Sequence, residues 1–220
     1  MQFFNLHTHK FTNNSKILEL VNQYPWEFDD LIANYSIGIH PWYIDENRLE
    51  TDLNTIEQKL QLLECLALGE CGLDKRIDID IALQIEVFEK QIALAEQYQK
   101  AIVLHLVSAF DELIEIKKRL KISVPMIIHG FSKSEQLANQ LIENGFYLSF
   151  GKYLLRNPEL KNVFENIPND RFFLETDTID ESIEDVYKIA SEYKKITILE
   201  MQEIINTNFE TVFKNKIQKN

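Results

Sequence analysis

Short apolar runs alternate with longer amphipathic stretches along the whole chain, and this alternation limits the folds open to it. Seven runs have the length of a β-strand, and most are rich in β-branched or aromatic residues, as buried parallel strands are. They cover residues 3–6, 35–39, 65–68, 101–104, 125–128, 146–150 and 172–174. Between the runs, apolar residues recur at helical spacing, for example at Ile81, Ile85, Phe88 and Ile92. The pattern predicts an α/β fold.

Two α/β architectures fit this pattern, a (β/α) barrel and an open doubly wound sheet. Seven strands with no convincing eighth favour a distorted TIM barrel with an incomplete or weak eighth strand. Residues 196–199 are compatible with a short strand, but Thr197 and Glu200 have capping-box spacing and predict that a helix begins there. Ser132 and Glu135 have the same spacing before another helical stretch. Because composition does not change along the chain, we expect a single domain over residues 1–220.

Charge and hydropathy argue against several classes of protein. The chain has 23 basic and 35 acidic residues, a formal net charge of −12, and no block rich in Lys or Arg. This argues against a protein that coats DNA, but not against an enzyme that contacts nucleic acid at one site. No apolar run approaches the ~20 residues of a membrane helix, and the N-terminus does not resemble a signal peptide. Cys65 and Cys71 are expected to be small buried residues, and the expected location is the cytoplasm.

All five histidines lie at, or just beyond, the C-terminal end of an expected strand. They are His7, His9, His40, His105 and His129, and two carboxylates, Glu70 and Asp177, follow further strands in the same way. Barrels and open α/β sheets both carry their ligand sites at this edge. We therefore expect these side chains to converge on one site.

The number and type of these residues indicate a metal centre. His7 and His9 are two residues apart on a strand, so both imidazoles point to one face and can hold one ion. Four imidazoles and two carboxylates exceed the three protein ligands usual for one catalytic zinc. They suit two ions bridged by a carboxylate, and Glu70 is the expected bridge.

Six short motifs, taken together, resemble the TatD family of metal-dependent deoxyribonucleases. The motifs are NLHTH, GIHPW, GECGLD, VLH, IHGFSKS and FLETD, and the C-terminal stretch TILEMQEIINTNFETVF is similar as well. The resemblance covers essentially the whole chain. It implies a distorted TIM barrel of the amidohydrolase-like kind. It also implies hydrolysis of phosphodiester bonds in DNA, often from the 3′ end, with two divalent metal ions.

The resemblance assigns a role to each strand-end residue. By motif, the first ion is held by His7, His9 and Asp177, the second by His105 and His129, and Glu70 bridges the two. A water shared by the two ions is the expected nucleophile, and the Asp177 carboxylate would orient it. Glu70 and Asp177 are therefore the expected catalytic residues.

Three departures from the family's pattern affect the expected substrate contacts. Lys10 and Phe11 follow the His-x-His motif, where the family has Leu-Asp. Val107 stands two residues after His105, where the family has an arginine. After the LETD motif, residues 178–180 lead almost directly into a helix, where the family has Ser-Pro-Tyr and a long loop.

Four further residues are candidate substrate contacts. His40 either contacts substrate or makes a structural hydrogen bond, and Trp42 either stacks on a base or packs within a loop. Lys152 and Arg156 either bind phosphate or are solvated surface charges. Glu175 is expected to support a ligand or form an ion pair instead of taking part in catalysis.

The sequence thus predicts a 3′–5′ exodeoxyribonuclease that acts on single-stranded DNA with two divalent ions, Mg²⁺, Mn²⁺ or Zn²⁺. Its partner would be DNA or a small phosphoester, with no membrane and no stable protein partner. One alternative is a binuclear amidohydrolase or lactonase, because the same metal cage can promote attack on a carbonyl carbon. Another is a protein without enzymatic activity in which the cage binds a stabilising metal ion.

Overall fold

The computed structural model describes residues 2–214, and the contacts within the chain divide it into two compact units. Unit 1 comprises Met1–Val21 and Ile127–Asn220, and unit 2 comprises Asn22–Met126. The single domain expected from the composition remains a prediction. Within the described residues, no helix combines the length and the apolar character that crossing a membrane requires.

The described part of the chain contains eight strands. The strands are β1 (Phe3–Thr8), β2 (Ile17–Gln23), β3 (Tyr35–Ile37), β4 (Cys65–Asp74), β5 (Ala101–Val107), β6 (Met126–Ile128), β7 (Tyr147–Phe150) and β8 (Phe172–Leu174). The helices are α1 (Leu49–Leu60), α2 (Ile81–Tyr98), α3 (Phe110–Leu120), α4 (Glu135–Glu143), α5 (Lys152–Arg156), α6 (Leu160–Asn166), α7 (Ile183–Lys194) and α8 (Ile198–Phe209). β1, β2 and β3 follow one another directly, and from β3 onward the strands are separated by helices. The strand order follows the chain from β1 to β8, which is the topology of a (β/α) barrel.

The seven apolar runs all contribute strands, and the additional strand is β2. The sequence predicted seven strands and a weak or incomplete eighth. The strand that the apolar pattern did not reveal is the second along the chain, β2. Glu19, Asn22 and Gln23 interrupt its apolar run, yet all three are buried. Glu19 is buried because its carboxylate accepts hydrogen bonds from the backbone N–H and the hydroxyl of Thr12. A strand that buries partnered polar groups lacks the apolar signature of its neighbours.

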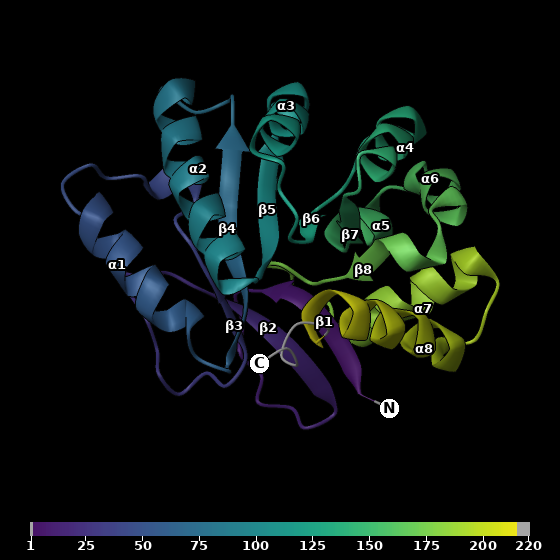
Figure 1. Ribbon diagram of the computed structural model, residues 1–220. Helices are drawn as coiled ribbons and strands as arrows, with labels where there is room; N and C mark the ends of the chain where they lie inside the picture. The colour runs from purple at the N-terminus through teal and green to yellow at the C-terminus, as the bar shows by residue number, and fades with distance from the viewer. Residues whose placement is uncertain (1, 215–220) are drawn as a thin grey trace. The chain divides into compact units, whose positions relative to one another are not determined.

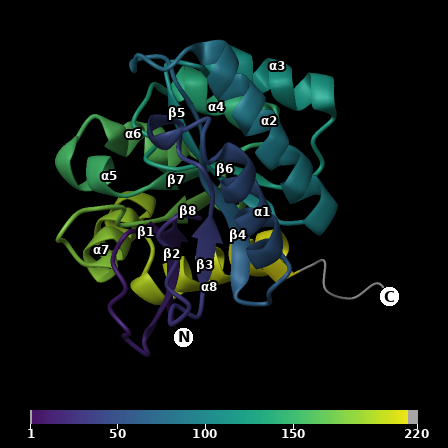
Figure 2. The ribbon, with the colours of Figure 1, turned by 90° about the vertical axis from the view of Figure 1, so that its left-hand side faces the viewer.

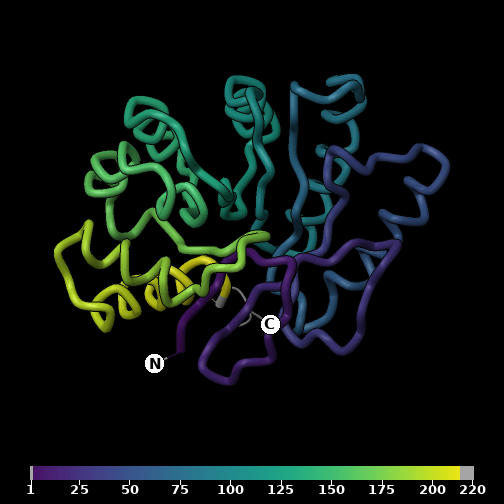
Figure 3. Tube along the Cα trace, turned by 180° about the vertical axis from the view of Figure 1, so that it is seen from behind, coloured from purple at the N-terminus to yellow at the C-terminus, as the bar shows by residue number. Residues whose placement is uncertain are grey.

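Unit 1 joins β1 to the segment that follows β8. β1 pairs in parallel with β2, and β6, β7 and β8 pair in parallel with one another. A parallel bridge between Thr8 and Asp177 continues this pairing, and Figure 3 shows the segment after β8 running beside the N-terminal strand. Figure 1 shows α7 and α8 beside β1, where the Phe4 ring meets the rings of Phe173 and Phe209 at centroid distances of 5.9 and 4.8 Å. The two ends of the chain thus share one aromatic core.

Unit 2 contains the parallel strands β3, β4 and β5, with α1 and α2 packed against β4. Figure 2 shows α1 in front of β4. Two buried glutamines of α2 hold the backbone beyond β3 and at the end of β4. Gln91 accepts from the N–H of Ile39 and donates to its carbonyl, and Gln84 does the same with Asp74. The first segment leads to His40, and the second ends the strand that carries Glu70.

Two helix starts were predicted from capping boxes, and one is as expected. Thr197 caps α8, and its reciprocal hydrogen bonds with Glu200 form the predicted box. The other prediction was wrong, because Ser134, and not Ser132, caps α4 by accepting from the N–H of Leu137. Glu135 is the first helical residue, so a cap at Ser132 would lie too far from the helix start.

Both cysteines are predicted to be unreactive in the folded protein. The Cys65 and Cys71 thiols are free and buried. Burial raises the pKa of Cys65 to about 12 and that of Cys71 well above its usual value, so neither forms thiolate at neutral pH. We expect no reaction of the native protein with a disulfide reagent such as DTNB over an hour, and two thiols after unfolding in guanidinium. Rapid reaction of either thiol in the native protein would contradict this burial.

Candidate metal centre

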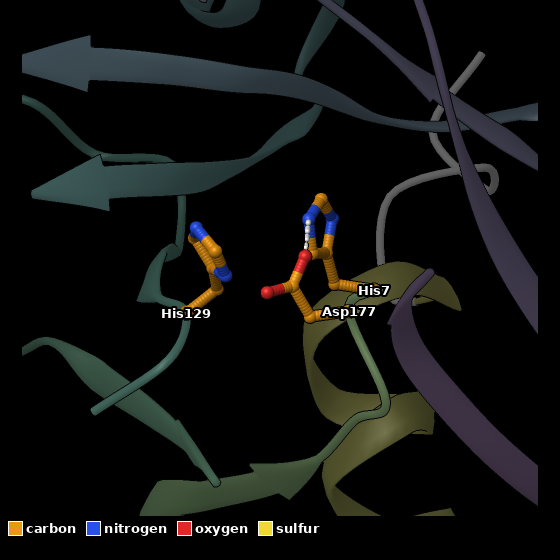
Figure 4. A group of neighbouring side chains, drawn as sticks. All are labelled: His7, His129 and Asp177. Atoms are coloured by element: carbon orange, nitrogen blue, oxygen red, sulfur yellow. Dashed lines mark ion pairs between the residues drawn. The ribbon is translucent and has the colours of Figure 1, made fainter. Parts of the chain in front are cut away.

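Unit 1 brings four of the predicted ligands together, and we call His7, His9, His129 and Asp177 the first cluster. His7, His129 and Asp177 each offer a ligand atom, and these atoms lie within 4.8 Å of one another. Nε2 of His7 is 3.7 Å from Oδ1 of Asp177, and the rings of His7 and His129 are 4.4 Å apart at their centroids. Figure 4 shows His7 and Asp177 side by side, with His129 facing them from another segment. Nε2 of His9 is 3.6 Å from Oδ1 of Asp177.

The backbone fixes the relative positions of His7, His9 and Asp177. The N–H of Asp177 donates to the carbonyl of His7 at 2.9 Å, and the N–H of His9 donates to the carbonyl of Asp177 at 3.2 Å. Asp177 has a φ of +54°, in the left-handed region that aspartate tolerates better than most residues. The two histidine rings are 5.1 Å apart, as expected for side chains on one face.

Glu175 is buried behind His129. Its side chain is 1% exposed, and its Oε1 accepts from the N–H of Gly130 at 2.7 Å and lies 3.5 Å from Nδ1 of His129. Burial alone would raise the pKa of Glu175, but the hydrogen bond and the charge of His129 outweigh it and the pKa is lowered. A proton on Nδ1 of His129 is thereby held toward Glu175, which leaves Nε2 to bind an ion. The sequence had assigned Glu175 such a supporting role.

Unit 2 assembles a second group of side chains, His40, Glu70 and His105, which we call the second cluster. Their ligand atoms also lie within 4.8 Å of one another. Oε1 of Glu70 is 3.0 Å from Nδ1 of His105 and 3.2 Å from Nε2 of His40. The sequence predicted that Glu70 follows the end of a strand. This was wrong, because β4 continues to Asp74 and Glu70 lies within it.

Asp74 orients His105, and the sequence analysis did not single it out. Its carboxylate accepts from Nε1–H of Trp42 at 2.7 Å and from the N–H of Arg76 at 2.8 Å, and lies 3.4 Å from Nε2 of His105. Burial raises the pKa of Asp74, but these partners lower it further, and the net direction is down. A proton on Nε2 of His105 then points to Asp74, and Nδ1 is the atom available beside Glu70. The signal for this residue was a carboxylate within the GECGLD motif, four residues after Glu70.

An irregularity in β4 and a close approach to β5 set the position of Glu70. The pairing of β4 with β5 changes register between Leu68 and Cys71, as in a β-bulge, and this places Glu70 in the irregular segment. Gly72 lies opposite His105 with a φ of +139°, and a Cβ there would lie 2.1 Å from the carbonyl oxygen of His105. Only glycine fits at this position, which explains the second glycine of the GECG motif.

His40 is placed to support Glu70. Its Nδ1 accepts a hydrogen bond from the N–H of Trp42 at 3.1 Å, so the neutral ring carries its proton on Nε2, which faces Glu70. A ring that uses both nitrogens in this way is a poor metal ligand. Of the two roles that the sequence left open, these contacts favour the structural hydrogen bond, and His40 is also buried.

The other candidate substrate contacts differ in their surroundings. Trp42 is 52% exposed, and its indole orientation is fixed by the hydrogen bond to Asp74. Arg156 is not a freely solvated charge, because its Nη2 donates to both carboxylate oxygens of Glu181, at 2.8 and 3.0 Å. Nζ of Lys152 lies 5.8 Å from the centre of the Tyr153 ring.

The donor atoms of both clusters fit a divalent cation. Imidazole nitrogen and carboxylate oxygen suit zinc, manganese and similar ions. The ligand atoms of His7, His129 and Asp177 are close enough to share one ion, and so are those of Glu70 and His105. The sequence placed His129 beside His105 at a second ion. In unit 1, His129 lies against His7, so it is also available to an ion held by the first cluster.

Sequence comparisons link the chain to metal-dependent hydrolases. The family model described as TatD related DNase matches residues 1–214. An uncharacterized metal-dependent hydrolase of Mycoplasma genitalium is 30% identical over 227 residues, which cover 91% of this chain and 84% of that protein. Proteins with the same description from Bacillus subtilis and Haemophilus influenzae are 36% and 32% identical over 69% and 66% of this chain. The matches span 60% and 59% of those two relatives, about three fifths of their length.

Solved structures match the fold. The crystal structure of YjjV, a TatD homologue from Escherichia coli, has a TM-score of 0.77 and 22% identity, covering 89% of this chain and 85% of that one. An uncharacterized amidohydrolase from Saccharomyces cerevisiae has a TM-score of 0.73 and 15% identity, covering 90% and 89%. At such identities the likeness shows the fold alone, and it confirms the predicted TIM-like α/β class.

The two supporting carboxylates give a prediction about metal affinity. Because Glu175 and Asp74 orient His129 and His105, we expect Glu175→Gln and Asp74→Asn each to weaken Mn²⁺ or Zn²⁺ binding about 10–100-fold without unfolding the protein. Competition with a chromophoric chelator measures the affinity, and circular dichroism checks the fold. Asp52→Asn is the matched control, since Asp52 is a buried carboxylate that pairs with Arg48. If all three variants bound the metal as tightly as the wild type, Glu175 and Asp74 would not contribute to metal binding through His129 and His105.

Proposed function

The chain belongs to the family of TatD-related DNases, as its motifs indicated, and on this premise we propose that it is a metal-dependent hydrolase of phosphodiester bonds. The proposed reaction is removal of nucleotides from the 3′ end of single-stranded DNA. The observation that carries the proposal is the pair of histidine–carboxylate clusters, one in each unit. The cytoplasmic location expected from the sequence stays a prediction.

The proposal assigns one divalent ion to each cluster, with Mg²⁺, Mn²⁺ and Zn²⁺ as candidates. His7, His9 and Asp177 would hold the first ion, and Glu70 and Nδ1 of His105 would hold the second. His129 is the sixth proposed ligand, and its place against His7 makes it available to the first ion. Such ions lower the pKa of bound water and neutralise charge on a phosphoryl group. That Glu70 also bridges the two ions stays a prediction from the sequence.

Asp177 is the proposed catalytic carboxylate of the first cluster. Its Oδ1 faces Nε2 of both His7 and His9, and its side chain is 27% exposed, so substrate and water can reach it. A carboxylate in this position can orient an attacking water and accept its proton. The backbone bonds to His7 and His9 hold it there, so little reorganisation is needed during the reaction.

In unit 2, protein groups orient the proposed ligands. His40 donates to Glu70, and a carboxylate oxygen of Asp74 lies 3.4 Å from Nε2 of His105, so each proposed ligand contacts a polar group outside the metal site. Trp42 bonds to the same Asp74 oxygen and presents a half-exposed ring. We propose that an unpaired base of the substrate stacks on this indole.

A small carbonyl substrate is the second candidate. The observation that favours it is Val107, which stands where the family has an arginine and so removes an expected phosphate contact. The same ligand set would then serve an amidohydrolase or lactonase reaction. Hydrolysis of lactones or amides without any cleavage of DNA would favour this candidate.

Cleavage of labelled DNA tests the proposed reaction. We expect the protein to shorten a 5′-labelled single-stranded oligonucleotide from its 3′ end in Mg²⁺ or Mn²⁺, and chelator to stop the reaction. Asp177→Asn removes the proton acceptor and should lower kcat by at least about 100-fold. Circular dichroism and metal content would show whether that variant keeps its fold and ions. Full activity of Asp177→Asn would remove this residue from the mechanism.

Substitution of Trp42 tests base stacking. Loss of one stacked base costs about 1–3 kcal/mol, so Trp42→Ala should weaken oligonucleotide binding about 5–150-fold. Trp42→Phe keeps an aromatic ring but loses the hydrogen bond to Asp74, and should retain most of the binding. Fluorescence anisotropy of a labelled oligonucleotide measures both. Equal losses in the two variants would assign the effect to the hydrogen bond and not to stacking.

A further inference from the structure

We propose that Lys10 and Arg156 form a binding site for substrate phosphate in unit 1, and that the carboxylates of Asp180 and Glu181 occupy this site when substrate is absent. The inference rests on the proposed function, because it names how that substrate's phosphates would be bound. The ligand class is the phosphate group of a phosphodiester.

Two successive carboxylates bind two cations that come from different parts of the chain. Nζ of Lys10 forms an ion pair with Asp180 and also donates to the carbonyl of Ile179 at 3.2 Å. Nη2 of Arg156, at the end of α5, donates to both oxygens of Glu181 at 2.8 and 3.0 Å. The segment between β8 and α7 therefore pairs with both cations.

The first pair joins two segments that also carry residues of the first cluster. Lys10 directly follows His9, and Asp180 lies three residues after Asp177. The segment is tied back by a hydrogen bond from the N–H of Ile179 to the carbonyl of Thr176 at 3.2 Å. A cavity of about 490 Å³ is bordered by Lys10, Thr176, Asp180 and Glu181. A phosphate bound by the cations would thus lie close to the segments that carry the proposed metal ligands.

The pairs are suited to exchange. The Asp180 side chain is 98% exposed and that of Lys10 is 49% exposed, and exposed ion pairs contribute little to stability. Carboxylate and phosphate oxygens use the same N–H donors, and a guanidinium binds both groups well. Phosphate can therefore replace the carboxylates, and their presence should weaken binding by competing for the same cations.

Neutralising the two carboxylates tests the proposal. We compare the wild-type protein with Asp180→Asn/Glu181→Gln by anisotropy of a labelled oligothymidylate, in chelator to prevent cleavage. The double variant should bind at least about 5-fold more tightly and show a steeper salt dependence, by up to about 1.4 in the log–log slope for two further phosphate contacts on a single strand. Glu184→Gln is the matched control, because Glu184 borders the same cavity and forms no ion pair in the described residues. It should change affinity less than 2-fold.

A second comparison shows whether tighter binding comes from freeing Lys10 and Arg156 or only from the lower negative charge of the protein. In a protein that also carries Lys10→Met and Arg156→Met, neutralising Asp180 and Glu181 should give no gain. A gain that persists in this background, an equal gain from Glu184→Gln, or no gain in the double variant would each overturn the proposal.

A third measurement tests the phosphate site if the protein does not bind DNA. If neither the wild type nor the double variant binds oligonucleotide, the DNA substrate of the proposed function is wrong, and inorganic tripolyphosphate is titrated by calorimetry. A Kd at least 5-fold lower in the double variant would support the phosphate site for another phosphoester. Equal affinities, or no binding by either protein, would overturn the inference itself.

Discussion

Two backbone hydrogen bonds between β1 and the segment after β8 set the geometry of the first cluster. One runs from the N–H of Asp177 to the carbonyl of His7, and the other from the N–H of His9 to the carbonyl of Asp177. Since side chains alternate between faces, a shift of one residue would turn the imidazoles away from the carboxylate. The aromatic core of Phe4, Phe173 and α8 holds this junction of the two chain ends in place.

In unit 2, contacts between side chains, and not backbone hydrogen bonds, orient the proposed metal ligands. His40 donates to Glu70, and Asp74 lies between His105 and the indole of Trp42. Gln84 of α2 fixes the backbone of Asp74, so a helix behind the sheet sets the orientation of a proposed metal ligand. One carboxylate oxygen thereby connects that ligand to the surface on which a base would stack.

The strand-end rule explains why so much of this arrangement could be predicted from sequence. Parallel strands place their ends at one edge of a sheet, so the apolar runs pointed to the histidines and to Asp177 as candidate site residues. That all of them meet at one site stays a prediction. β2 was missed because its buried polar residues interrupt the apolar pattern. Asp74, and the pairing of Lys10 with Asp180, depend on contacts between segments far apart in sequence, which no local spacing encodes.

Metal content tests the central claim, that each cluster binds one divalent ion. The protein would be equilibrated with excess Mn²⁺ or Zn²⁺, passed through gel filtration and analysed for metal per chain. The account predicts two ions in the wild type, and one each in His7→Ala/His9→Ala and in His105→Ala, with the fold retained. A single ion in the wild type, or the loss of both ions from His105→Ala in a folded protein, would contradict it.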